Sequence, residues 1–91
     1  MDFEWDPAKA ERHRRKPGIT FDEAVTVFVD PQELSMFDPD HSIVEDRFVS
    51  IGESNAGRLL VVGYTERGGK IRIIFARWAT WPERFDYEEA P

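Results

Sequence analysis

The sequence has 91 residues, and its 12 lysines and arginines against 18 aspartates and glutamates give a net charge of −6. This length allows one domain with one small core, so we expect a single domain over residues 1–91. A hydrophobic fraction of 41% indicates a folded chain, and the absence of cysteine excludes disulfides and thiolate metal sites. The acidity argues against a protein that coats nucleic acid, but it leaves room for a local basic site or a basic partner.

The sequence also argues against secretion, membrane insertion and cofactor binding. The N-terminus lacks the basic leader and apolar stretch of a signal peptide. The longest apolar runs, Leu59–Val62 and Ile71–Ala76, are too short to span a bilayer. His13 and His41 are the only histidines and have no neighbouring histidine, so we expect no metal and no cofactor. We therefore expect a cytoplasmic protein without a membrane segment.

The N-terminal part predicts a short strand followed by a basic helix. Phe3–Trp5 alternates apolar and polar residues, as a strand does. Asp6 and Pro7 then suit the N-cap and the first position of a helix that runs through Lys16. The segment Pro17-Gly18 ends this helix.

A second helix and four strands are predicted next. Thr20 and Glu23 have the spacing of a capping box, and apolar residues at helical spacing continue to Asp30-Pro31. Short turn-forming spacers separate four strand candidates, which favours an antiparallel meander. The four candidates are Glu33–Phe37, Glu45–Gly52, Leu59–Thr65 and Lys70–Arg77.

A last helix should start near Thr80, which again stands three residues before a glutamate, Glu83. The predicted fold class is therefore α+β, with two N-terminal helices, an antiparallel meander sheet and a C-terminal helix.

The stretch from Tyr64 to Tyr87 is cationic although the chain is acidic. Strand alternation places Ile71, Ile73 and Phe75 on a core face, and Arg72, Ile74 and Trp78 on the opposite face. Arginine presents a planar fork that matches phosphate oxygens. Metal-free RNA cleavage needs such a charge at the phosphorus, together with groups that move protons. Here Glu83, Tyr87 or a histidine are candidates for proton transfer, and ordinary surface ion pairs are the alternative. The arginines of this stretch are Arg67, Arg72, Arg77 and Arg84.

Three further features allow both a functional and a structural interpretation. The basic run Arg12–Lys16 suits RNA or an acidic partner, but also a solvated helix end. The segment Asp38–His41 is typical of a turn whose carboxylates cap backbone amides, and it supports a cation site only weakly. The neighbouring Trp78 and Trp81 suit core packing, base stacking or a partner's pocket.

A set of short segments, spread over nearly the whole chain, has a characteristic order and spacing. The segments are Phe3–Pro7, Arg15–Phe21, Glu23-Ala24, Val27-Phe28, Asp30-Pro31, Asp38–Ser42, Glu45–Phe48, Ile51-Gly52, Gly57–Val62, Tyr64–Gly68, Ile71–Ile74, Ala76-Arg77, Ala79-Thr80, Glu83-Arg84 and Tyr87–Glu89. Taken together, they resemble the BrnT toxin family. The resemblance implies a RelE-like fold and a ribonuclease toxin of a type II toxin–antitoxin pair, which cleaves RNA and inhibits translation. It also implies a BrnA-like antitoxin with a ribbon-helix-helix part, through which alone the complex binds promoter DNA.

The resemblance, together with the two basic segments, gives the candidate site of a metal-independent endoribonuclease. The candidate catalytic residues are Arg47, Arg72, Arg77, Glu83 and Tyr87. The candidate RNA-binding residues are Arg15, Lys16, Arg67, Thr80 and Arg84.

The chain departs from the family pattern at several positions. Pro17 replaces a histidine that the family usually carries before its second helix, and Phe75 replaces a serine. Trp78, Trp81, Pro82 and Phe85 stand where basic residues are common. The alternative hypothesis is therefore a catalytically attenuated binding module that complexes its antitoxin and tunes promoter autorepression.

Overall fold

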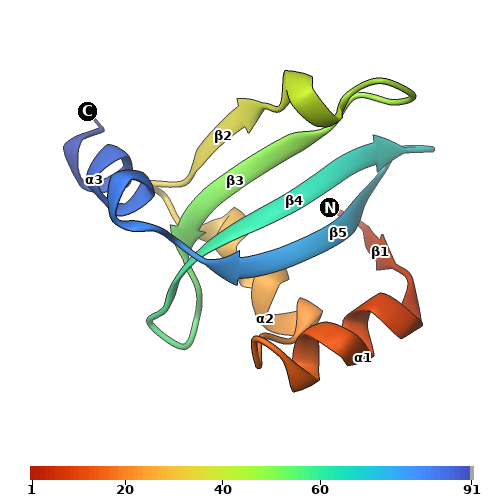
Figure 1. Ribbon diagram of the computed structural model, residues 1–91, viewed down its shortest axis with the longest axis horizontal. Helices are drawn as coiled ribbons and strands as arrows, with labels where there is room; N and C mark the ends of the chain where they lie inside the picture. The colour runs from red at the N-terminus through yellow and green to blue at the C-terminus, as the bar shows by residue number, and fades with distance from the viewer. Residues whose placement is uncertain (91) are drawn as a thin grey trace.

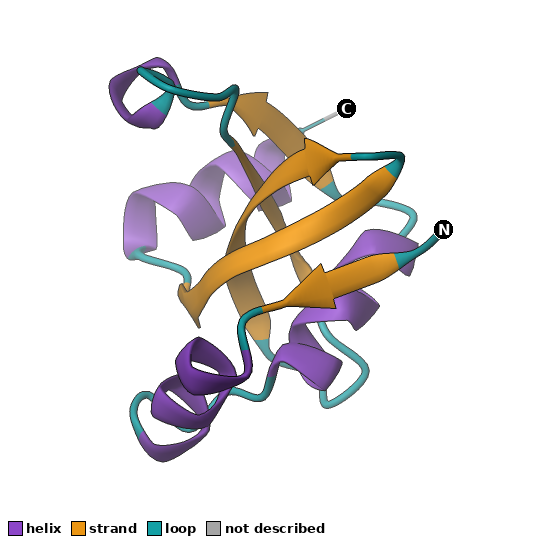
Figure 2. Cartoon of the chain, turned by 90° about the vertical axis from the view of Figure 1, so that its right-hand side faces the viewer, coloured by secondary structure: helices purple, strands orange, loops and turns teal. Residues whose placement is uncertain are grey.

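The computed structural model describes residues 1–90 and shows an α+β fold in which a twisted sheet carries helices on both faces (Figures 1 and 2). The elements in chain order are β1 (Phe3–Trp5), α1 (Pro7–Arg15), α2 (Phe21–Val25), the 3₁₀ turn η1 (Thr26–Val29), β2 (Leu34–Phe37), the 3₁₀ turn η2 (Pro39–His41), β3 (Phe48–Glu53), β4 (Leu59–Arg67), β5 (Lys70–Trp78) and α3 (Trp81–Glu89).

The sheet is mixed, with the strand order β1-β5-β4-β3-β2. The predicted antiparallel meander is confirmed for β2 to β5. The prediction of a purely antiparallel sheet is wrong, because β1 pairs in parallel with β5, with Phe3 opposite Ile71 and Trp5 opposite Ile73. The chain between β1 and β5 includes α1, α2 and the strands β2 to β4, and this long connection meets the requirement of a parallel pair.

The helices form where the sequence provides caps. The side chain of Asp6 accepts a hydrogen bond from Ala8 N, and Thr20 accepts one from Glu23 N. The predicted second helix is shorter than expected, because after Val25 the chain tightens into the 3₁₀ turn η1 before Asp30. Within residues 1–90, no helix has the length and apolarity needed to cross a membrane.

Two apolar clusters pack on opposite faces of the sheet. The larger one lies beneath α1 and α2 and includes Phe21, Leu60 and Ile73, all almost completely buried. The smaller one contains Ile51, Leu59 and Val61, against which Tyr87 of α3 packs. Figure 2 shows α3 and α2 on opposite sides of the sheet. Helix α3 covers only part of its face, so part of the sheet near η2 stays open.

A β-bulge in β5 decides which side chains reach this open part. Gly63 pairs with Phe75 but the next residue, Tyr64, pairs with Ile73, so Ile74 has no partner on β4. Alternation therefore reverses after Ile73. Phe75 packs on the smaller cluster and not with Ile73 as predicted, while Ala76 joins the larger cluster.

The same reversal corrects the predicted position of Trp78. Trp78 pairs with Leu60 of the larger cluster, and the Arg58 guanidinium lies 5.1 Å from its ring centroid. Arg58 in turn pairs with Glu23 of α2. Trp78 therefore lies on the α2 side of the sheet and not beside Arg72, whereas Arg77 lies on the open face.

Candidate active site

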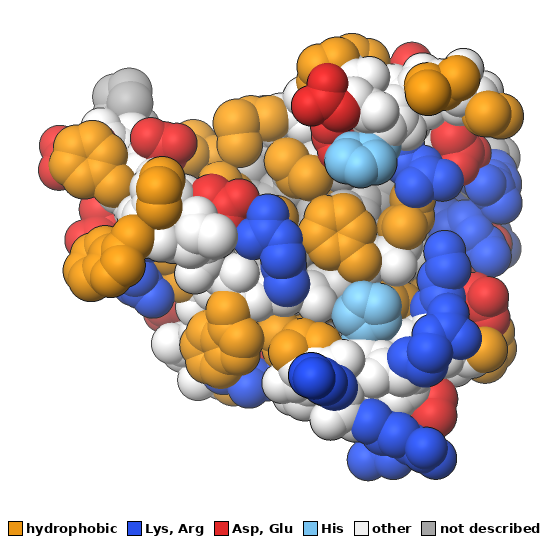
Figure 3. All heavy atoms as spheres, in the orientation of Figure 1, with side chains coloured by type: hydrophobic (Ala, Val, Ile, Leu, Met, Phe, Trp, Pro, Cys, Tyr) orange, Lys and Arg blue, Asp and Glu red, His pale blue; other side chains and the backbone are white. Residues whose placement is uncertain are grey.

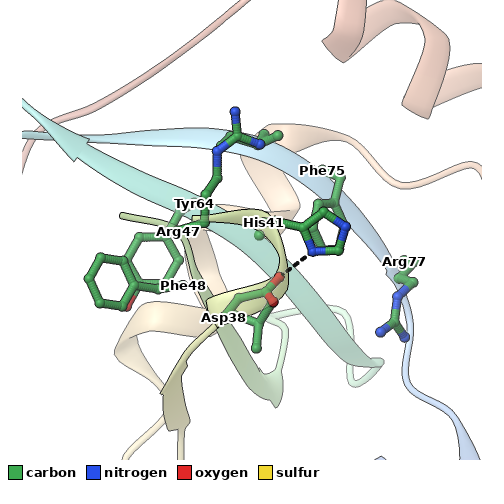
Figure 4. A pocket seen from close by; sticks show the side chains of 10 residues that line it. Asp38, His41, Arg47, Phe48, Tyr64, Phe75 and Arg77 are labelled. Atoms are coloured by element: carbon green, nitrogen blue, oxygen red, sulfur yellow. Dashed lines mark hydrogen bonds and ion pairs between the residues drawn. The ribbon is translucent and has the colours of Figure 1, made fainter. Parts of the chain in front are cut away.

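A pocket of about 360 Å³ lies on the open face of the sheet, next to η2 (Figure 4). Its floor comes from the central strands and its walls from η2, from the loop before β3 and from β5. The lining residues are Asp38, His41, Arg47, Phe48, Val49, Gly63, Tyr64, Ile74, Phe75 and Arg77.

The floor of the pocket depends on a glycine facing an aromatic ring. A Cβ atom on Gly63 would lie 2.0 Å from Cε2 of Phe75, so only glycine lets this ring lie flat on β4. The ring of Phe75 then forms an apolar base beneath His41, as Figure 4 shows.

The loop between β2 and β3 brings three polar residues of the pocket together. Pairing of Phe37 with Phe48 closes this loop at its base. Asp38 N donates to the Arg47 carbonyl oxygen over 2.8 Å, and Arg47 N donates to Ser42 Oγ over 2.9 Å. These bonds fix both ends of the loop, so Asp38, His41 and Arg47 line one pocket although the chain separates them.

His41 and Asp38 form a hydrogen-bonded pair inside the pocket. His41 Nδ1 lies 2.8 Å from Asp38 Oδ2, and the histidine side chain is 72% exposed. In the neutral tautomer that donates Nδ1–H to this carboxylate, Nε2 is free to accept a proton. In Figure 4 the ring lies between Arg47 and Arg77.

Arg77 is held by a carboxylate at the start of α3. Its Nη1 and Nη2 donate to the two oxygens of Glu83 over 2.7 and 2.8 Å, and Nη1 also reaches the Trp78 carbonyl oxygen. These bonds use three of the five N–H groups of the guanidinium. The side chain is still 43% exposed, so the remaining donors are open to a ligand in the pocket.

Glu83 is an anchor for Arg77 in this geometry. The bond from Arg77 lowers the pKa of Glu83 to about 2, and the Thr80 backbone N–H adds to this effect against the opposing effect of burial. Thr80 is the N-cap of α3 and completes a capping box with Glu83. Glu83 is therefore ionised at neutral pH and has no proton to give.

Arg47 shares a carboxylate with Arg67. Arg47 Nη2 lies 3.2 Å from Glu45 Oε2, and Arg67 Nη2 lies 2.9 Å from Glu45 Oε1. Hydrogen bonding, first from Arg67, lowers the pKa of the Glu45 carboxyl. Arg47 Nε is buried without a partner, and Nη1 has no carboxylate partner among residues 1–90. One carboxylate thus holds Arg47, which lines the pocket, and Arg67, which lies outside its lining.

The other candidate catalytic residues lie outside the pocket. Arg72 is on the same face, but it pairs with Glu4 of β1 over 3.2 Å at the sheet edge. Tyr87 donates to Asp30 Oδ2 over 2.6 Å, and burial together with Asp30 raises its pKa to about 12. This bond ties α3 to the segment before β2, so Tyr87 serves packing in this arrangement.

The remaining candidate RNA-binding residues are spread over the surface. Arg15 bonds Glu11 and Lys16 is the C-cap of α1, away from the lining of the pocket. Arg67 lies near the β4–β5 turn, and Arg84 is half-buried on α3. In Figure 3 basic side chains gather along the right and lower parts of the face that carries the pocket.

His41 and Asp38 line the pocket but are not among the candidate site residues predicted from the sequence, which names a histidine only as one of three candidates for proton transfer. The sequence signal for them is an aspartate three residues before a histidine, on either side of Pro39. The predicted turn is confirmed, but the predicted capping is wrong, because the Asp38 carboxylate caps no backbone amide of the turn and bonds His41, which lines the pocket. The described residues 1–90 contain no cluster of three or more histidine, cysteine or acidic side chains placed to hold a metal ion.

Comparison with known proteins supplies the family. No curated protein matches the chain. A family model described as ribonuclease toxin, BrnT, of type II toxin-antitoxin system matches residues 5–83. This range includes every residue that lines the pocket, whereas Arg84 and Tyr87 lie beyond it. The chain therefore belongs to the BrnT family of ribonuclease toxins of type II toxin–antitoxin systems.

Proposed function

We propose that the protein is a metal-independent endoribonuclease whose active site is the pocket between Arg47 and Arg77. The observation that carries this proposal is the Asp38–His41 pair, which lies between two arginines on an apolar floor. The proposal keeps Arg47 and Arg77 as catalytic residues, replaces Glu83 and Tyr87 as proton-transfer groups with His41, and leaves Arg72 as a flanking residue.

The chemistry follows from the charges around the pocket. His41 Nε2 takes the proton of a ribose 2′-hydroxyl, and the freed oxygen forms a bond to the adjacent phosphorus. The bond from phosphorus to the 5′-oxygen breaks, and that oxygen takes a proton from water. The free N–H groups of Arg47 and Arg77 bind the phosphate oxygens, whose charge grows in the transition state. Arg67, Arg15 and Lys16 extend the basic surface for the RNA strand, with Thr80 and Arg84 near Arg77.

In the cell, this activity implies a toxin that inhibits translation by cleaving RNA. The family match supports a cognate BrnA-like antitoxin with a ribbon-helix-helix part, which neutralises the toxin and carries the complex to promoter DNA. We further infer a single toxin domain over residues 1–91 with a RelE-like arrangement, acting in the cytoplasm.

RNA cleavage by the purified protein in EDTA tests the proposal. Arg47→Ala and Arg77→Ala should each lower the cleavage rate about 100-fold or more, because each removes charge at the phosphate. Arg14→Ala is the matched control, since Arg14 pairs only with Glu11 on exposed α1. This variant should cleave RNA at the wild-type rate. Equal rates of RNA cleavage in the wild type and all three variants would contradict the assignment of the pocket as the active site.

A second candidate function is the catalytically attenuated binding module. Phe75 favours it, because an apolar ring forms the floor of the pocket where the family pattern has a serine hydroxyl. Expression without the antitoxin separates the two functions. Growth arrest by the wild type but not by Arg77→Ala supports the ribonuclease, whereas unimpaired growth with stable protein supports the binding module.

A further inference from the structure

The outward face of α3 carries exposed aromatic side chains that the pocket does not use. Trp81 is 81% and Phe85 63% exposed, and their spacing of four residues places them on one side of the helix. Glu83 and Tyr87, in contrast, turn inward to Arg77 and Asp30. The helix therefore has an inner face that supports the site and an aromatic outer face without a partner among residues 1–90.

Carboxylates flank this aromatic stripe. Asp86, Glu88 and Glu89 are all exposed, and Glu89 continues the stripe one turn beyond Phe85. The only cation of the helix, Arg84, is half-buried. In Figure 3 hydrophobic and acidic side chains alternate at the left end of the molecule, where Figure 1 places α3.

Exposed aromatic rings beside carboxylates indicate which kind of partner could bind this face of α3. Aromatic faces attract lysine and arginine through cation–π contacts, and exposed tryptophan is a frequent anchor in protein interfaces. The three carboxylates add attraction for cations and repel the phosphates of RNA. Helix α1 of a second copy is basic, but its exposed face offers few apolar groups to cover Trp81 and Phe85.

We propose that Trp81, Phe85, Asp86, Glu88 and Glu89 form a docking surface for a cationic amphipathic helix of a protein partner. This inference rests on the proposed function in one respect, because within a toxin–antitoxin pair the partner is the antitoxin. Docking there places the partner next to Arg77, since Glu83 on the inner face of the same helix holds that arginine.

Calorimetric titration tests the docking surface with two probes. The first is the antitoxin encoded beside the toxin gene, and the second is a synthetic amphipathic helix with lysine on one face and leucine on the other. Trp81→Ser and Phe85→Ser should each weaken the binding of both probes about tenfold. The matched control is Ile43→Ser with Val44→Ser, which removes apolar side chains that are 91% and 96% exposed elsewhere and should leave binding unchanged.

Charge reversal supplies the second arm. Glu88→Lys with Glu89→Lys should weaken the lysine peptide about tenfold or more, and a peptide with glutamate in place of lysine should regain binding to this variant. The matched control, Asp2→Lys with Glu66→Lys, changes the net charge by the same amount at exposed positions outside α3. This variant should keep its preference for the lysine peptide over the glutamate peptide. Circular dichroism confirms that each variant is folded.

Three results would overturn the docking surface. They are unchanged affinity of the Trp81 and Phe85 variants for both probes, a loss of RNA binding in these variants with partner binding intact, and a wild-type dimer that the variants abolish. RNA cleavage measured on the same proteins keeps the two proposals apart. A wild type that binds the antitoxin through α3 but leaves RNA intact would defeat the ribonuclease proposal and leave the docking surface standing.

Discussion

At the scale of single residues, the proposed chemistry of the pocket depends on His41 and on the residues that hold it. Asp38 precedes η2 and bonds Nδ1 of His41, while Phe75 lies beneath the ring. Neither arginine of the pocket can accept a proton near neutral pH, because guanidinium stays protonated. Among the side chains that line the pocket, the His41 imidazole has a ring nitrogen, Nε2, that can accept a proton while Nδ1 bonds Asp38.

His41→Ala should lower the single-turnover cleavage rate about 10²- to 10⁴-fold, because the 2′-hydroxyl loses its proton acceptor. Asp38→Asn should lower it less, about tenfold, since the ring keeps its nitrogen but loses the carboxylate that orients it. Asp40→Asn is the matched control, because Asp40 lies in the same 3₁₀ turn and does not bond His41. Loss of activity in the Asp40 variant equal to that of Asp38→Asn would contradict the orienting role.

At the scale of elements, the bulge in β5 sets the side of the sheet on which Arg77 lies, and the cap of α3 fixes its guanidinium. The unpaired Ile74 turns Arg77 to the open face, and Glu83 at the start of α3 fixes its guanidinium. Strand alternation read from the sequence places Phe75 and Trp78 on the wrong faces. A bulge depends on how β5 pairs with β4, so the alternation within one strand does not reveal it.

Gly63→Ala should destabilise the protein by about 1–3 kcal/mol in urea unfolding, because its methyl group would collide with the Phe75 ring. Combining it with Phe75→Ala should give a smaller loss than the sum of the single changes, by about 1 kcal/mol, since the smaller side chain makes room. Gly57→Ala is the control without a collision, because only its φ of 74° opposes a side chain there. Additive effects of Gly63→Ala and Phe75→Ala would contradict the proposed contact.

The ion pair at the start of α3 predicts a pH dependence of stability. The pKa of Glu83 is about 2 in the folded protein against an ordinary value of 4.5, so the folded state favours the ionised form. Its contribution to the unfolding free energy is complete above about pH 4.5 and is lost as the pH falls toward 2. Glu83→Gln should make the unfolding free energy depend less on pH in this range, as measured by urea titrations at several pH values. The exposed Glu88→Gln on the same helix is the control, and an unchanged slope in Glu83→Gln would contradict the prediction.

At the scale of the whole molecule, the two faces of the sheet differ, because one is covered by packed helices and the other carries the pocket. Helices α1 and α2 cover the larger apolar cluster, and the opposite face is shared between α3 and the pocket. The charges are also unevenly placed, since two arginines line the pocket and basic side chains gather on the right and lower parts of its face, while the acidic residues of α3 lie at one end of the molecule (Figure 3). A chain of net charge −6 can thus offer a basic site to RNA and an acidic surface to a partner.

Much of this arrangement is predictable from local sequence patterns. Caps and turn residues indicate α1, α3 and the meander from β2 to β5, because these features depend on neighbouring residues. The parallel pairing of β1 with β5 and the assembly of His41 with Arg77 depend on contacts between distant segments. For that reason Arg47 and Arg77 could be named from the sequence, whereas a histidine stood only as one of three candidates for proton transfer.

Analysis of the RNA ends produced by the wild-type protein in EDTA tests the central claim most directly. Proton removal from a 2′-hydroxyl by His41 predicts fragments with 2′,3′-cyclic phosphate and 5′-hydroxyl ends, and no cleavage where a 2′-deoxy nucleotide replaces the reacting ribose. Fragments with 3′-hydroxyl and 5′-phosphate ends, or cleavage that persists at the 2′-deoxy position, would contradict the account.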